Sequence, residues 1–564
     1  MPDEMDNKTI RDSLFMARYS AFSPYRLIRR ENGFENPVGA SDAMSRSLYC
    51  GMKPIASWDY VQANALPTGG VFNLEFSPEG TLLVAACEKK SIQIFDPLTH
   101  QRIHTVNGAH SDCVNCVKFL DGRMFATCSD DTTIALWDVR NLKKKIRSLL
   151  GHSNWVKNIE FSVKDKLLVT SGLDGSIYTW DINSYTEFNL VYQRVFHASG
   201  LMRCRLSPNA KQMVMCTTGG LLVIIHDLNL STLAQDLHGF KPNLYRLMQM
   251  SQQVIPIAAS YDHLFDFKRT ENRVEFVSDF PDGNDAEVVS ALQIHPQGWT
   301  ALSRNISHDD RSEWSCIHDI QPANELSDKS CRDTSPPPPP APRRAPPRRP
   351  RRRPRPYRHP RPAPPAAPTP AAEAGQVGRN FNMQRIMGIN TGISPPAALR
   401  PRPLRASPAR LFPAAQLVPP ARVNRSTQPS TSGSTTRARD SGCEDEVRHF
   451  IRQNRDRLLY YIEETNEGKG FIKELCYSAD GRLVCSPFGR GMRLLALNDR
   501  CSELSHCVRD LSGPAQMVDV GQSLGIHQDL VVSSKFSPRH HLLVTGCLEG
   551  KIVWYEPYSG EALY

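Results

Sequence analysis

The chain has 564 residues, of which 40% are hydrophobic and 22% charged, so it can bury a sizeable core. Its length corresponds to roughly three to four domains unless a repeat fold absorbs it. No apolar run reaches the roughly 18 residues that a transmembrane helix needs, and the start, MPDEMDNKTIRDSLF, lacks the apolar segment of a secretory signal. We therefore expect no membrane contact, no secretion, and a nuclear or cytoplasmic location, or both.

The formal net charge of +10 is unevenly distributed along the chain. Between Ser335 and Arg425 there are 18 arginines, no lysine and one acid, Glu373, which gives this stretch +17 and leaves −7 for the rest. The basic pI therefore belongs to one segment and does not argue for nucleic-acid binding by the whole protein.

The 15 cysteines would permit disulfides, but without a secretory signal we expect thiols that pack as small hydrophobic groups. One Cys-x-x-Cys pair, Cys113 and Cys116, follows His110. A zinc or redox site would need a second ligand pair or a βαβ setting, and the sequence shows neither. We expect no metal ion and no cofactor.

Residues 1–50 form an N-terminal extension with a candidate helix-loop-helix. Helical spacing relates Ile10, Leu14, Ala17 and Phe22; Pro24 interrupts it, and Tyr25, Leu27 and Ile28 begin a second apolar stretch. The alternative is an extension that packs on the domain that follows it.

Two consecutive segments, Gly108–Arg140 and Gly151–Asn183, repeat the same pattern. Each opens on Gly-His or Gly-x-His and closes on Trp-Asp, with the histidines 42 residues apart and the tryptophans 43 residues apart. This period and these ends are typical of WD repeats. Each repeat holds three short runs with strand character separated by turn residues, and such small sheets bury both faces only when they stack radially.

Weaker copies extend the set to seven units. The others are Gly69–Asp96, a unit that ends at His226-Asp227, Val288–Ile320, Gly470–Leu497 and His527–Pro557. We predict an all-β, seven-bladed WD-repeat β-propeller whose last blade is completed by an N-terminal strand near Ile55–Tyr60.

The propeller is predicted to be discontinuous in sequence. Units one to five occupy residues 51–320, with an insert at 229–287, and units six and seven occupy 446–564. Residues 321–445 between them include 17 prolines from Pro336 to Pro370 and few aromatic residues, which predicts a long disordered loop.

The repeats account for most of the conspicuous polar residues. We expect a structural WD network in which a histidine bonds a turn aspartate and the network reaches a tryptophan; its members are His110, Asp131, Trp137, His152, Asp174, Trp180, His527 and Trp554. No set of residues suggests catalysis, so we expect no enzyme activity.

Arg140 is not explained by the blade. It follows Asp131, Trp137 and Asp138 at the end of unit two, where the chain turns out to the rim, and the third unit has Asn183 instead. A guanidinium there offers a fork of five donors to a partner. The alternative is an ordinary solvated arginine.

The pattern of an aspartate six residues before Trp-Asp-x-Arg resembles the signature box of the DCAF proteins. The resemblance extends over roughly residues 50–230, 288–320 and 455–557, through DCVNCVKFLDGRMFATCSDDTTIALWDVRNL, GHSNWVKNIEFSVKDKLLVTSG, YIEETNEGKGFIKELCYSADGRLVCSP and KFSPRHHLLVTGCLEG. DCAF proteins are WD-repeat substrate receptors of cullin-4 RING ubiquitin ligases. The resemblance implies a non-catalytic receptor that docks on the damaged-DNA-binding adaptor subunit and presents an unidentified protein substrate. The implied adaptor contacts are Arg140, Asp138 and Trp137, with Leu14 and Tyr25 of the N-terminal segment.

Two other functions stay open from the sequence. One is a scaffold outside ubiquitination, for which the repeats alone suffice. The other is association with RNA or chromatin through the arginine-rich loop, but this loop has only Tyr357, Phe381 and Phe412 for base stacking, which makes nucleic acid an unfavourable partner.

Overall fold

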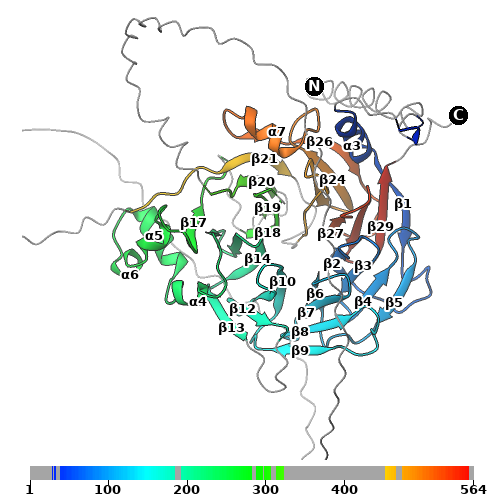
Figure 1. Cartoon of the computed structure of the whole chain (residues 1–564). Coiled ribbons are helices and arrows are strands. Elements are labelled where there is room, and N and C mark those ends of the chain that lie inside the picture. Colours follow the sequence, from blue (N-terminus) through cyan, green and yellow to red (C-terminus); the bar gives the residue numbers. More distant parts are fainter. Residues whose placement is uncertain are drawn as a thin grey trace, which may run out of the picture. The chain divides into compact units, whose positions relative to one another are not determined.

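The computed structural model describes residues 28, 31–33, 39–183, 192–281, 288–295, 297–305, 313–322, 451–464 and 473–557. Within them, seven sheets stand around a common axis (Figure 1), and the predicted seven-bladed propeller is confirmed. The Pro/Arg-rich insertion from residue 323 to 450 and the candidate helix-loop-helix, apart from Ile28, lie outside the described residues.

Blades 1 to 3 follow the sequence without interruption. Their strands, from the innermost outwards, are β2 (Val71–Phe76), β3 (Leu83–Cys87), β4 (Ile92–Phe95) and β5 (Arg102–Val106); β6 (Val114–Phe119), β7 (Met124–Ser129), β8 (Thr133–Asp138) and β9 (Arg147–Leu150); and β10 (Val156–Ser162), β11 (Leu167–Gly172), β12 (Ser176–Asp181) and β13 (Tyr192–His197).

Blades 4 and 5 each take their fourth strand from beyond an insertion. Their strands are β14 (Leu201–Leu206), β15 (Met213–Thr217), β16 (Leu222–His226) and β17 (Arg273–Val277); and β18 (Val288–Ile294), β19 (Trp299–Asn305), β20 (Glu313–Asp319) and β21 (Leu458–Glu464). The insert expected at 229–287 therefore contains β17, and the chain after residue 446 first completes blade 5. Sequence periodicity missed both strands because they lie far from the unit they complete.

Blades 6 and 7 close the ring. Their strands are β22 (Cys476–Tyr477), β23 (Leu483–Phe488), β24 (Gly491–Ala496) and β26 (Val518–Ser523); and β27 (Val531–Phe536), β28 (Leu543–Cys547), β29 (Ile552–Pro557) and β1 (Met52–Trp58). β1 pairs antiparallel with β29, so the N-terminal strand completes the last blade as expected.

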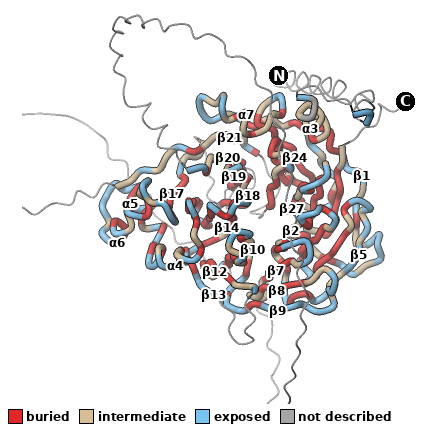
Figure 2. The backbone as a smooth tube through the Cα atoms, viewed as in Figure 1, coloured by how far each residue is buried: buried red, intermediate tan, exposed pale blue. Residues whose placement is uncertain are grey.

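Burial follows the distance of each strand from the axis. Among the second strands, β3 and β28 are buried throughout, whereas the residues of β5 and β9 on the perimeter are mostly exposed or half-buried. Figure 2 shows the buried inner strands and the exposed outer turns. The apolar core is therefore divided among the interfaces between neighbouring blades, each of which buries both faces of a sheet that could not bury them alone.

Strand direction gives the propeller two faces. On one face, called the network face here, lie the loops that lead into each innermost strand and the turns between second and third strands. On the other, the Arg140 face, lie the turns between innermost and second strands and the connections from third to outermost strands. These third-to-outermost connections differ most between blades.

The long connections all begin on the Arg140 face. In blade 4 the connection forms α4 (Leu233–Asp236), α5 (Pro242–Ser251), α6 (Pro256–Ala259) and the 3-10 helix η1 (Asp262–Phe265). In blade 6 it forms α7 (Leu504–Cys507), η2 (Val508–Asp510) and β25 (Ala515–Gln516), which pairs with β21 and covers that edge of blade 5.

The two sides of the blade 5 insertion are held together by Arg457. Its guanidinium donates from Nη1 to the carbonyl of Asp319 at 2.6 Å and from Nη2 to Glu275 at 2.6 Å. The amide of Asp319 donates to the Arg457 carbonyl at 2.8 Å. Blade 5 is thus clamped where the chain leaves and where it returns.

A helix that the sequence analysis did not anticipate, α3 (Ala40–Cys50), precedes β1. Tyr49 packs its ring 5.7 Å from Phe536 and 4.7 Å from His541, and Asp42 pairs with Arg482 at 3.1 Å. These partners lie in blades 6 and 7, so α3 is part of the propeller.

Candidate functional site

Blade 2 contains a hydrogen-bonded network that joins its entry loop to its third strand. His110 Nδ1 lies 3.0 Å from Asp131 Oδ2, and His110 Nε2 lies 2.8 Å from Thr127 Oγ1. Trp137 Nε1 donates to the same hydroxyl at 2.9 Å. The threonine can serve both neighbours because a hydroxyl donates once and also accepts. Each buried polar group of this network therefore has a partner.

Blade 3 repeats the arrangement. His152 Nδ1 lies 3.0 Å from Asp174 Oδ2, and both His152 Nε2 and Trp180 Nε1 lie 2.8 Å from Thr170 Oγ1. Sequence reasoning missed the threonines, although each precedes its tryptophan by ten residues and that shared offset could have revealed them.

Blade 7 has only part of the network. His527 Nε2 lies 2.8 Å from Thr545 Oγ1, but among the described residues no group accepts a hydrogen bond from Trp554 Nε1. Tyr555, not Trp554, occupies the register position of Trp137, since Tyr555 pairs with Leu543 as Trp137 pairs with Phe125. Trp554 is fully buried one position earlier and packs against Phe95.

Protonation in these networks follows from burial and hydrogen bonding. Burial lowers the pKa of His527 to about 3, with the Lys551 charge adding to the shift. Burial opposes ionisation of Asp131, but hydrogen bonds from His110 and the Ser111 amide hold its pKa well below the usual range. Blade 2 thus holds an ionised carboxylate, whereas blade 7 holds a neutral imidazole.

The turn after Trp137 is built around Asp138, on the Arg140 face. Asp138 Oδ1 accepts the Arg140 amide at 2.9 Å, and Oδ2 accepts Arg123 Nε at 3.0 Å and Nη2 at 2.8 Å. The hydrogen bond from Arg123 lowers the pKa of Asp138. Arg123 was not singled out from the sequence; it follows the Asp121-Gly122 turn, which brings it beside the end of β8.

The same turn recurs in other blades with a different residue at its tip. The amides of Leu98 and Asn183 donate to Asp96 and Asp181, each at 2.9 Å, as the amide of Arg140 donates to Asp138. Arg140 is exposed, and among the described residues no hydrogen bond or ion pair engages its guanidinium. Blade 2 therefore offers a free five-donor group where its neighbours offer a leucine and an asparagine.

The expected adaptor-binding residues are distributed as follows. Trp137, Asp138 and Arg140 are adjacent, but Trp137 is only 3% exposed and its ring faces the blade interior. Asp138 is occupied by Arg123, and Arg140 alone presents its functional group to solvent. Leu14 and Tyr25 lie outside the described residues.

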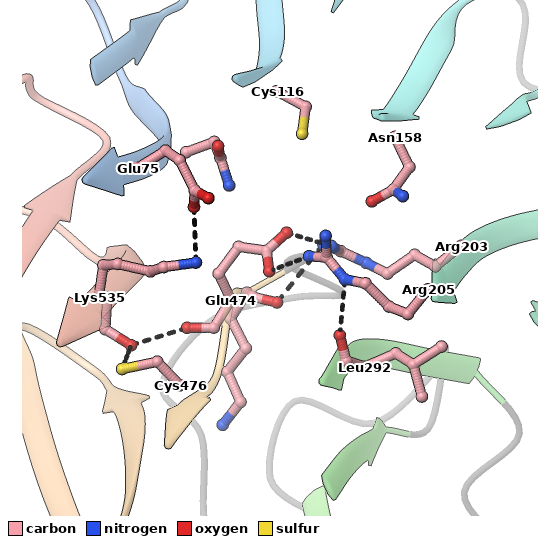
Figure 3. Close-up of polar contacts among 12 residues, drawn as sticks. Glu75, Cys116, Asn158, Arg203, Arg205, Leu292, Glu474, Cys476 and Lys535 are labelled. Atoms are coloured by element: carbon pink, nitrogen blue, oxygen red, sulfur yellow. Dashed lines mark hydrogen bonds and ion pairs between the residues drawn. The ribbon is translucent and has the colours of Figure 1, made fainter. Parts of the chain in front are cut away.

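A second polar cluster surrounds the propeller axis (Figure 3). Lys535 of blade 7 pairs with Glu75 of blade 1 at 2.6 Å. Lys118 of blade 2 lies 3.9 Å from Glu75 and 3.2 Å from Glu160 of blade 3. Arg205 of blade 4 continues the series with Glu160 at 2.8 Å.

The next ion pairs join blade 4 directly to blade 6. Arg205 Nη2 pairs with Glu474 of blade 6 at 2.8 Å, Arg203 pairs with the same carboxylate, and Arg205 Nε donates to the carbonyl of Leu292 in blade 5 at 3.1 Å. Burial opposes ionisation of Glu474, but the two arginines lower its pKa. The side chains of Arg203, Arg205 and Glu474 are buried, and their charges are paired with one another.

The WD domain, G-beta repeat family matches residues 62–96, 100–138 and 143–181, which lie in blades 1 to 3 and the loops before them. DDB1- and CUL4-associated factor 10 of Danio rerio is 33% identical over 91% of this chain and 78% of its own length. This chain belongs to the DDB1- and CUL4-associated factor 10 family. The Homo sapiens protein of that name is 31% identical over 93% of this chain and 75% of its own length. The Xenopus tropicalis protein is 31% identical over 91% of this chain and 89% of its own length. The match to DDB1- and CUL4-associated factor 10 extends well beyond the three recognisable repeats.

Two further observations concern the described ranges alone. No helix in them is both long and apolar enough to cross a bilayer, and they contain no group of three or more side chains that could hold a metal ion. Cys113 and Cys116 do not face a common site: Cys113 is half-buried in a loop, whereas Cys116 is buried in β6 opposite Cys128.

Proposed function

We propose that this chain is a non-catalytic substrate receptor of a cullin-4 RING ubiquitin ligase, which docks on the DDB1 adaptor through the Arg140 face of blade 2. The observation that carries the proposal is the exposed guanidinium of Arg140 in a chain whose relatives are named for association with DDB1 and CUL4. The rest of the molecule would hold a protein substrate for ubiquitination.

The geometry around Arg140 suits a protein contact. The backbone at its base is fixed by Asp138, and Asp138 is in turn fixed by Arg123, so little order has to be gained when a partner binds. A guanidinium donates to carboxylates or carbonyls in a planar fork, which makes arginine a frequent anchor of interfaces.

The surroundings of Arg140 support docking on this face. In blades 1 and 2 the third-to-outermost connections are short, whereas the long connections of blades 4 and 6 begin on the same face. Blade 2 therefore lies in a sector that inserted helices do not elaborate.

The position of α3 supports a contribution from the N-terminal segment. Met52, at the start of β1, pairs with Pro557 at the end of β29, and the third strands end on the Arg140 face. α3 contacts residues of the turns on that face, including Arg482 and His541. α3, which follows the segment with Leu14 and Tyr25 in the chain, thus lies on the face that carries Arg140.

Substitution of Arg140 tests the docking site. Arg140→Ala should weaken DDB1 binding by about 2 kcal/mol, roughly 30-fold in Kd, with unchanged thermal unfolding. Asn183→Ala, at the equivalent turn of blade 3, is the matched control and should bind normally. Equal recovery of DDB1 by wild-type chain and Arg140→Ala in quantitative pull-downs would refute docking through this residue.

A truncated chain that begins at residue 40 tests the N-terminal segment. Because α3 is retained, thermal unfolding should change little while DDB1 affinity falls at least severalfold. A melting temperature lowered by many degrees would instead assign the segment to the propeller.

Co-purification separates this proposal from the other two functions. The receptor should recover DDB1 and accumulate ubiquitinated partners when the proteasome is inhibited. A scaffold outside ubiquitination would recover neither, and a protein bound through nucleic acid would lose its partners on nuclease treatment.

A further inference from the structure

The connection between β8 and β9, residues 139–146, is strongly basic on one side. Its exposed residues include Arg140, Lys143, Lys144, Lys145 and Ile146, and it contains no acid. Val139 and Leu142 point the other way and pack against the core cluster between blades 1 and 2. The segment, called the basic connection below, thus has an apolar inner side and a cationic outer side.

Backbone hydrogen bonds fix the basic connection at both ends. The amide of Val139 donates to the Arg123 carbonyl at 2.9 Å, and that of Asn141 to the Asp138 carbonyl at 3.0 Å. At the far end the amide of Ile146 donates to the Leu136 carbonyl at 2.8 Å. The lysines therefore project from a short, anchored segment.

The acids at the two turns that meet beside Arg140 are already engaged. Asp138 binds Arg123, and Asp121 accepts the amides of Arg123 and Met124 at 2.7 and 2.6 Å. Within the described part of the chain no ion pair reaches Lys143, Lys144 or Lys145. Their positive charge is consequently available to a partner.

Charge in blade 2 is segregated between the two faces. On the network face its loops carry Asp112, Asp130 and Asp131 and no lysine or arginine. On the Arg140 face, the turn between β10 and β11 of blade 3 carries the exposed Lys164 and Lys166 on either side of Asp165. Asp130 is already paired with Lys157 at 2.8 Å, and Asp131 is hydrogen-bonded to His110. The unpaired charge of blade 2 is therefore mainly positive and lies on the Arg140 face.

Exposed aliphatic side chains accompany the basic residues. Ile146 is 53% exposed, and the neighbouring blades contribute Leu98 at 54% and Val163 at 58%, both from turns or connections on the Arg140 face. Apolar contacts among charged residues are typical of a protein interface, whereas binding of single-stranded nucleic acid relies on aromatic stacking, for which the basic connection has no residue.

We infer that the basic connection binds an acidic protein surface on the DDB1 adaptor, with Lys143–Lys145 facing its carboxylates and Ile146 in an apolar contact beside them. This inference rests on the proposed docking through Arg140 and extends it. Arg140 serves as the central anchor, and the lysines steer the encounter, since exposed charges at an interface act mainly on the association rate.

Charge reversal tests the inference in the full-length chain with purified DDB1. The variant K143E/K144E/K145E should associate at least about tenfold more slowly at low salt and lose most of the salt dependence of the wild-type rate. K89E/K90E reverses two exposed lysines of the β3–β4 turn on the network face and should associate normally. Ile146→Ala should leave association unchanged and speed dissociation severalfold.

The outcomes separate this inference from the proposed function. If Arg140→Ala weakens binding but the triple variant associates like the wild type, the role of the basic connection is overturned and docking through Arg140 stands. If the wild-type chain does not bind DDB1, both are overturned. Equal slowing by K89E/K90E, or retention of RNA that the triple variant abolishes, would also overturn a specific acidic protein contact. Unchanged thermal unfolding of K143S/K144S/K145S, with slowed association, would exclude misfolding as the cause.

Discussion

Blades 2 and 3 pair their buried polar groups in a different way from blades 4 to 6. In blades 2 and 3 a histidine, a threonine and a tryptophan form a local network within about 30 residues of chain. In blades 4 to 6 buried ion pairs join residues far apart in sequence, such as Arg205 with Glu474 and Arg457 with Glu275.

Only the region with local networks can be recognised from the sequence. A local network repeats with the period of the blade, so its residues leave a pattern in the sequence. An ion pair between residues 269 positions apart, as between Arg205 and Glu474, leaves none. Blades 4 to 6 also carry the long connections between their third and fourth strands. Their core residues follow no sequence repeat, and additional segments extend from their Arg140 face.

The largest expected effect is the loss of a network tryptophan. Trp137→Ala removes a buried aromatic ring and leaves Thr127 without its donor, which should lower the free energy of unfolding by about 3–5 kcal/mol. Chemical denaturation measures it. A variant as stable as the wild type would show that the local network does not stabilise blade 2.

Breaking the ion pairs of blades 4 to 6 comes next. Glu474→Gln leaves Arg203 and Arg205 without their shared carboxylate, and an uncompensated buried charge should cost about 3 kcal/mol. In the Glu474→Gln variant, amide hydrogen exchange should speed up more in blades 4 to 6 than in blades 2 and 3, relative to the wild type. Uniform loss of protection in all blades would mean that the two regions do not differ in cooperativity.

Lowering the pH tests the protonation state of His527 in blade 7. His527 has its pKa lowered to about 3, so its contribution is complete above the unfolded value near 6.5 and is lost as pH falls from there towards 3. Asp131, whose pKa is also lowered, loses its contribution only below about 4. His527→Gln should therefore reduce the slope of stability against pH between 6.5 and 4.5 by up to about 1.4 kcal/mol per unit. An identical slope in wild type and variant would contradict a neutral buried imidazole.

The smallest effect is expected from removing most of the blade 5 insertion. Deleting residues 335–440 should leave the propeller folded and stabilise it by about 1–2 kcal/mol, because a shorter loop costs less closure entropy. The clamp of Arg457 on Asp319 remains in place. Aggregation of the expressed deletion variant would instead make the insertion part of the fold.

The sequence predicted the architecture better than the details of individual blades. The seven-bladed propeller and the closing strand follow from periodicity and strand patterning, which local residues determine. β17 and β21 were missed because insertions separate them from their blades. α3 was missed because its role depends on contacts with residues more than 400 positions away, Phe536 and Arg482. Tyr555 takes the register position of the network tryptophan because a bulge-free pairing with β28 fixes it there, which a motif search centred on Trp554 does not see.

At the candidate site, the sequence singled out Arg140 from its departure from the repeat. It did not single out Arg123, whose contact with Asp138 depends on how two turns meet in space. Nor did it weigh Lys143–Lys145, because a run of charges has meaning only once the structure shows which side of the connection is anchored.

The charges of the axial cluster alternate in sign from blade to blade. Around the axis the innermost segments contribute Glu75, Lys118, Glu160 and Arg205 from blades 1 to 4, then Glu474 and Lys535 from blades 6 and 7. Positive and negative groups can alternate around a closed ring only if their number is even, and seven blades is odd. Blade 5 contributes no charged side chain to this series and has the neutral Gln293 in its innermost strand. Each blade is thereby distinguishable from its neighbours by sign, so an exchange of adjacent blades would place like charges together. Arg203, the second cation of blade 4, also pairs with Glu474, so the signs still alternate from blade to blade. The blade without a charge in this series is the one whose strands are split by the longest insertion.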